Sequence, residues 1–179
     1  MLKKLVFCLA AVTCTIFQQA HTLDRPNSRH ATAALYASSL LLGAKLGAKS
    51  GAEQGKTPQS VVNCLLALDA SRLTDLVESL LAANLTPAEL QAADVFFESS
   101  AGKKYAQLGT LDLYLSAGEM PPQDAPNISP EENKEIEDFN GSTTSKKLWN
   151  LLNGASARRE FGTRLLALEK SCGVGKRKQ

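Results

Sequence analysis

LTPAELQAADVFFESSAGKKY, residues 85–105, is the stretch that decides the fold, because the chain repeats it. At an offset of 43 residues and with no gap, residues 128–148 read ISPEENKEIEDFNGSTTSKKL. A repeat of this kind predicts one structural unit that is built twice. The matching pairs are Thr86 and Ser129, Pro87 and Pro130, Glu89 and Glu132, Phe96 and Phe139, Ser99 and Ser142, Lys103 and Lys146, and Lys104 and Lys147.

Each copy begins with the signature of a helix N-terminus. A Thr or Ser cap accepts a backbone N–H, proline suits the first helical position, and the glutamate reaches back to the N–H of the cap. Later in each copy a second serine, followed by small residues, is typical of another cap. We therefore expect two αα-hairpins, over residues 85–118 and 128–153. Helical spacing elsewhere predicts an all-α fold, a single helical bundle of about seven or eight helices.

The first copy resembles DUF2059, a family of bacterial periplasmic domains. That family carries an acidic Glu-Leu, then Phe-Tyr, Ser, Gly and Lys-Lys, although Phe97 stands here for the family's tyrosine and Ser100 for its frequent proline. The resemblance covers about a third of the chain and implies an all-helical envelope protein with no catalytic residues. Some helical envelope proteins of this general kind are immunity partners of antibacterial effectors. The matching residues are Glu89, Leu90, Phe96, Phe97, Ser99, Gly102, Lys103 and Lys104.

Residues 1–20 have the pattern of a secretory signal peptide. Two lysines precede an apolar run, residues 5–17, which is too short to span a bilayer. We expect export to the periplasm by a Sec-type signal, a mature domain over residues 21–175 and no transmembrane segment. A lipoprotein anchored through Cys14 is the minority interpretation.

The charge balance argues against nucleic acid as a partner. The chain has 20 basic and 18 acidic residues. Two of the basic residues lie in the signal peptide, so the exported protein is neutral. Residues 176–179 form a basic tail, which is either a frayed end or a contact for anionic lipid. A neutral body does not offer the basic face that nucleic-acid binding requires.

Cleavage of the signal leaves two cysteines, Cys64 and Cys172. An oxidising compartment predicts a disulfide between them, with two free thiols as the alternative. The two histidines, His21 and His30, lie near one end, so we expect no metal site, no cofactor and no histidine-activated nucleophile. We therefore predict no catalytic residues and no enzymatic activity.

A glycine stripe marks the long helix predicted for residues 29–56. Gly43, Gly47 and Gly51 recur at every fourth residue, which places them on one side of a helix. Because glycine costs about 1 kcal/mol per helical position relative to alanine, such a stripe favours a close backbone contact. That contact is either another helix of the same domain or a groove for a partner.

The sharpest expectation concerns an acidic surface. Residues 119–128 hold three prolines and form an irregular segment, which joins an acidic helix start. The interpretation is a docking patch for a basic protein partner, with a solvated helix face and loop as the alternative. The predicted partner-binding carboxylates are Glu119, Asp124, Glu131, Glu132 and Glu135.

Two classes of function follow from these features. The first is a non-enzymatic periplasmic protein-binding protein, in its specific form an immunity protein that neutralises a secreted antibacterial effector. The alternative is a structural or housekeeping envelope factor that acts at lipid or peptidoglycan. The sequence does not predict the oligomeric state.

Overall fold

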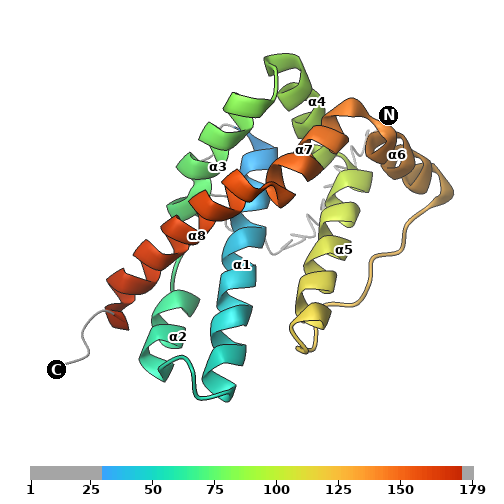
Figure 1. Ribbon diagram of the computed structural model, residues 1–179. Helices are drawn as coiled ribbons and strands as arrows, with labels where there is room; N and C mark the ends of the chain where they lie inside the picture. Colours follow the sequence, from blue (N-terminus) through green and yellow to red (C-terminus); the bar gives the residue numbers. More distant parts are fainter. Residues whose placement is uncertain (1–29, 175–179) are drawn as a thin grey trace, which may run out of the picture.

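The computed structural model describes residues 30–174 and is all-α, as predicted (Figure 1). These residues form eight α-helices and no strand. The predicted signal peptide, Cys14, His21 and the basic tail lie outside the described residues. The helices are α1 (Ala31–Glu53), α2 (Gln59–Leu66), α3 (Ser71–Asn84), α4 (Pro87–Glu98), α5 (Ser100–Ser116), α6 (Pro130–Gly141), α7 (Thr143–Asn153) and α8 (Ala155–Glu169), followed by a π-helical turn (Lys170–Val174).

Helix α1 is the centre of the bundle. Ala33, Ala37 and Leu41 recur at every fourth residue and are buried, so one side of α1 packs into the core. Helices α2, α3, α4 and α5 all contact it. Figure 1 shows α1 running between α2 and α3 on one side and α5 on the other.

Both hairpins start with the predicted caps. The hydroxyl of Thr86 accepts the N–H of Glu89 at 3.3 Å, and the Glu89 carboxylate accepts the N–H of Thr86 at 2.9 Å. Ser129 and Glu132 repeat this arrangement at 3.2 and 2.8 Å. Two donors at each helix start are thereby satisfied, which confirms the capping boxes predicted from the repeat.

A serine forms the corner of each hairpin. Ser99 ends α4 and caps α5, because its hydroxyl accepts the N–H of Gly102 at 3.1 Å. Ser142 does the same between α6 and α7, where it accepts the N–H of Ser145 at 3.0 Å. One extended residue therefore joins two helices in each copy, and the αα-hairpins are confirmed.

The two hairpins pair reciprocally. Glu89 of the first copy bonds Lys147 of the second at 2.7 Å, and Glu132 of the second bonds Lys104 of the first at 2.6 Å. Exchanging the copies turns one ion pair into the other. The same exchange of copies turns a contact between α4 and α7 into a contact between α5 and α6, and the structure has both contacts. The hairpins are therefore related by an approximate two-fold axis, as in an isologous dimer interface.

Two equivalent aromatic rings lie at the centre of this pairing. Phe96 and Phe139 stack with ring centroids 3.8 Å apart and an interplanar angle of 7°. Phe97 and Tyr105 pack edge-on against Phe96. Each ring is the repeat equivalent of the other, so the stack lies where a two-fold axis passes.

The surroundings of the two hairpins differ. On the first copy, Phe97 packs edge-on against Tyr36 of α1 at 5.9 Å, and Asp94 accepts the N–H and the hydroxyl of Thr32 at 2.9 and 2.7 Å. The equivalent residues of the second copy, Asn140 and Glu137, are exposed. Helix α1 thus covers the first hairpin, whereas the second hairpin packs through α7 against α3 and α8.

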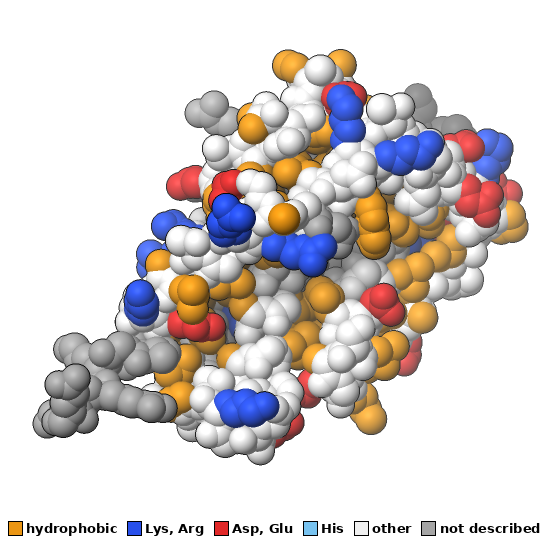
Figure 2. Space-filling view, viewed as in Figure 1, with side chains coloured by type: hydrophobic (Ala, Val, Ile, Leu, Met, Phe, Trp, Pro, Cys, Tyr) orange, Lys and Arg blue, Asp and Glu red, His pale blue; other side chains and the backbone are white. Residues whose placement is uncertain are grey.

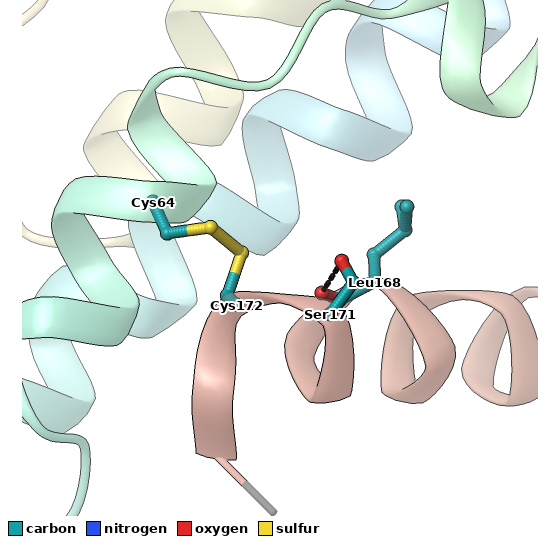
Figure 3. Close-up of a disulfide and its surroundings, with 4 residues drawn as sticks. All are labelled: Cys64, Leu168, Ser171 and Cys172. Carbon is teal, nitrogen blue, oxygen red and sulfur yellow. Dashed lines mark hydrogen bonds between the residues drawn. A yellow bond between two sulfur atoms is a disulfide. The ribbon is translucent and has the colours of Figure 1, made fainter.

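The predicted disulfide joins Cys64 of α2 to Cys172 of the terminal π-helical turn (Figure 3). Its Cα atoms are 5.5 Å apart, and the two cysteines are 108 residues apart in the sequence. A cross-link over such a loop stabilises the fold by on the order of 4–5 kcal/mol in the chain-entropy model. The bond fastens the end of the chain to the small cluster of Val61, Val62 and Leu65 beneath α1.

Candidate functional site

The interhairpin segment, residues 117–129, is the predicted irregular linker. Helix α5 ends at Ser116, and Gly118 in the turn that follows has a φ of +74°, which favours glycine. The N–H of Glu119 then turns back to the carbonyl of Tyr114 at 2.9 Å. From Glu119 to Ser129 the chain has no regular helix, as its three prolines predict.

Side chains from two helices hold this segment in place. Lys49 of α1 forms a 2.5 Å ion pair with Glu119 at the segment's start, and this hydrogen bond raises the pKa of Lys49. The amide of Gln107 on α5 donates to the Gln123 side chain at 3.3 Å and to the Asp124 carbonyl at 3.1 Å. The segment is therefore ordered before any partner binds.

Three of the five predicted partner-binding carboxylates bond side chains that are distant in the sequence. Glu119 pairs with Lys49, and Glu132 accepts from Lys104 and from the Ser100 hydroxyl, both at 2.6 Å. Glu135 accepts from the Ser99 hydroxyl at 2.6 Å. The structure therefore gives these three a role in holding the hairpins and the segment together.

The other two predicted carboxylates, Asp124 and Glu131, are exposed. Glu131 accepts the Ser129 hydroxyl at 2.8 Å. A hydrogen bond from its own backbone N–H and the bond from Ser129 lower the pKa of Glu131. At neutral pH Glu131 therefore carries a full negative charge that faces solvent.

An apolar side chain projects from the same acidic segment. Met120 is 89 % exposed, and Leu115 at the end of α5 is 63 % exposed. Pro121 and Pro126 beside them are half-buried. The segment thus presents apolar side chains on a fixed backbone with charged residues along it, which is the composition of a protein-binding patch.

Only one glycine of the stripe lies in close contact with another part of the chain. A Cβ added at Gly51 would collide with the side chain of Thr57, whose N–H bonds the Gly51 carbonyl. A Cβ at Gly43 or Gly47 would meet nothing within 4 Å. The close contact at Gly51 is therefore made by the turn that follows α1 and not by another helix, and the expectation of close helix packing is wrong at Gly43 and Gly47, where that side of α1 is open.

Helix α2 begins one residue later than its Thr57-Pro58 pattern predicts, since that pattern is typical of a cap followed by proline at the first helical position. Pro58 is itself the cap of α2 and adopts an extended conformation. The Thr57 N–H instead bonds the Gly51 carbonyl of α1.

A concave site at the junction of α5, α6 and α7 was not predicted. Trp149 of α7 is 70 % exposed. It borders a pocket of about 350 Å³, and Figure 2 shows hydrophobic side chains exposed between these helices. The signal was present in the repeat, because Trp149 replaces Ala106 and Asn140 replaces Phe97. The pocket is lined by Tyr105, Asn140, Ser145, Lys146, Trp149 and Asn150.

Within residues 30–174, no helix combines the length and the apolar character needed to cross a membrane. In the same range, no three His, Cys, Asp or Glu side chains are grouped so that they would hold a metal ion.

No family model matches this chain, and searches of curated proteins and of solved structures found no significant similarity. The resemblance of residues 85–105 to DUF2059 therefore stays a prediction.

Proposed function

We propose that this chain is an exported, non-enzymatic protein that binds one protein partner in the periplasm, in its specific form an immunity protein that neutralises a secreted antibacterial effector. The observation that carries the proposal is Met120, almost fully exposed on a segment that is otherwise held in place. An exposed large apolar side chain on an ordered, conspicuously long connection is a feature of interaction sites.

Preorganisation supports this use of the interhairpin segment. Contacts from Lys49 and Gln107 fix the segment before a partner arrives, and Pro121, Pro122 and Pro126 restrict its backbone. Because less conformational entropy is then lost on binding, more of the contact energy appears as affinity.

Charge supports a basic partner. Asp124 and Glu131 are exposed on the segment and at the start of α6, while the exported chain as a whole is neutral. A local excess of one sign steers an oppositely charged partner and raises its association rate. Export rests on residues 1–20, outside the described residues, and agrees with a disulfide in the folded domain.

The experiment has two steps. Tagged chain isolates its partner from envelope extract, and co-expression with that partner tests rescue of growth. Binding is then measured for Asp124→Lys/Glu131→Lys and for Met120→Ala. Both variants spare Glu119, Glu132 and Glu135, because those side chains hold the fold.

Asp75→Lys/Glu98→Lys is the matched control, with the same change in net charge on exposed positions elsewhere. We expect the test reversal to slow association about tenfold at low salt, with a smaller effect at high salt. The control reversal should change the association rate little. Equal effects of the two reversals, together with unchanged binding of Met120→Ala, would contradict the proposal.

A further inference from the structure

We propose that the pocket at the junction of α5, α6 and α7 binds an amino-sugar glycan that carries a carboxylate. The pocket and the interhairpin segment share no residue, and the inference rests on the proposed function only for export to the envelope. It assigns a ligand site to the junction between the two hairpins.

The pocket exists because the second copy departs from the first at two positions. Phe97 of the first copy is buried and packs against α1, whereas its equivalent, Asn140, is exposed and lines the pocket. Ala106 of the first copy is replaced by Trp149, the single tryptophan of the chain. The second copy therefore carries a large aromatic ring that is 70 % exposed.

The lining indicates the class of ligand. Two aromatic side chains, Tyr105 and Trp149, offer faces on which the C–H face of a pyranose ring can stack. The side-chain amides of Asn140 and Asn150 each donate and accept, as hydroxyl and acetamido groups require. The described lining contains no aliphatic side chain, whereas grooves that receive a partner helix are predominantly apolar.

Lys146 adds the preference for an acid. It lines the pocket, it is exposed, and no ion pair to it exists among the described residues. Its neighbour Lys147 is held by Glu89 at 2.7 Å, so the two lysines have different surroundings. An ammonium group beside an aromatic and amide lining favours a carboxylate on the bound sugar.

The size agrees with a short glycan. A volume of about 350 Å³ lies at the lower end of the range of roughly 300–1,000 Å³ found for small-molecule sites. In the envelope, the disaccharide of N-acetylglucosamine and N-acetylmuramic acid combines pyranose rings, acetamido groups and a carboxylate. The proposal therefore points to cell-wall glycan rather than to a neutral polysaccharide.

Because Trp149 is the only tryptophan, intrinsic fluorescence of the full exported chain reports on this pocket alone. Three soluble probes are titrated: the N-acetylglucosamine–N-acetylmuramic acid disaccharide, neutral di-N-acetylchitobiose, and digalacturonate, which has carboxylates and no acetamido group. We expect a saturable change with the first probe and weaker binding of the other two.

Variants test the named roles. Asn140→Ala and Asn150→Ala should each weaken the disaccharide about tenfold by fluorescence, and Trp149→Ala by at least as much in calorimetry. Lys146→Gln should remove the preference for the acid over chitobiose. Lys103→Gln is the matched control, because Lys103 is the exposed repeat equivalent of Lys146 on the first hairpin. Circular dichroism checks that each variant is folded.

Several results would overturn the proposal. The pocket is no glycan site if none of the three probes changes the fluorescence, or if only a protein partner does so. If the disaccharide and chitobiose bind equally well, and Lys146→Gln does not change this, the pocket has no preference for a sugar that carries a carboxylate. If digalacturonate binds as tightly as the disaccharide, the amides of Asn140 and Asn150 do not recognise the acetamido groups.

Discussion

The first and second hairpins have the same internal construction and different surroundings. Both have a capping box, a serine corner and a Glu–Lys pair to the other copy. The first lies under α1 and buries Leu90, Ala93, Phe96 and Phe97 on α4, whereas α6 buries only Ile136 among its residues. The shared residues are thus those that pair the hairpins, and the differing residues are those that meet another helix or solvent.

The largest expected difference concerns the stacked rings. Phe96→Ala should lower the free energy of unfolding by about 3–5 kcal/mol, because Phe96 is buried and contacts three other rings. Phe139→Ala should cost less, because Phe139 is only half-buried. Urea denaturation of both variants measures the difference, and equal losses would show that α1 does not make the first copy the more buried one.

Substitutions next to the two serine corners should also change the stability of the fold by different amounts. A Cβ at Gly102 would lie 1.9 Å from the carbonyl oxygen of Phe96 and 2.8 Å from the Cα of Phe97. The backbone cannot move away cheaply, so Gly102→Ala should cost about 3 kcal/mol.

The second copy supplies the control for this prediction. Ser145 is the repeat equivalent of Gly102 and already carries a Cβ, so Ser145→Ala should change stability by no more than about 0.5 kcal/mol. Thermal unfolding distinguishes the two variants. A tolerated alanine at Gly102 would show that the corner of the first hairpin is as loose as that of the second.

Acid should affect both copies in the same way. The bond to Lys147 and that to the Thr86 backbone lower the pKa of Glu89 from 4.5 to about 2, and the bonds to Lys104, Ser100 and Ser129 do the same for Glu132. A carboxyl with a lowered folded-state pKa stabilises the fold above its unfolded pKa and loses this contribution as the pH falls.

The chain should therefore lose stability as the pH falls from about 4.5 to about 2. Glu89→Gln/Glu132→Gln should be less stable at neutral pH and should show a shallower loss over that interval. Denaturation midpoints across this range measure the slope, and an unchanged slope would show that the two glutamates do not carry the acid sensitivity.

The sequence was sufficient for the parts of the fold that local chemistry determines. Caps such as Thr86 and Ser99 act within four residues of themselves, and the cysteine pair had no competitor, so both were predictable. The reciprocal ion pairs were not predicted, although Glu89 and Lys104 recur in both copies. Their partners depend on how two hairpins pack, and no local pattern states that Glu89 meets Lys147 rather than Lys104.

The candidate sites were less predictable for the same reason. The irregular acidic segment was foreseen from its prolines, but tertiary packing gives Glu119, Glu132 and Glu135 partners within the chain. The repeat predicts that Trp149 lies on the second helix of the second hairpin, but local spacing does not say whether that side of the helix is covered. In the structure α7 packs against α3, α4 and α8, and Trp149 stays 70 % exposed.

The most direct test of the reciprocal pairing is a rescue across the copies. Glu89→Lys should destabilise the chain, because it places two lysines together at the contact with Lys147. Adding Lys147→Glu restores an ion pair and should recover part of the lost urea midpoint. Adding Lys104→Glu should recover nothing and should destabilise further, because Lys104 holds Glu132. Rescue by Lys104→Glu instead of Lys147→Glu would show that each hairpin pairs with itself, and it would contradict the two-fold arrangement.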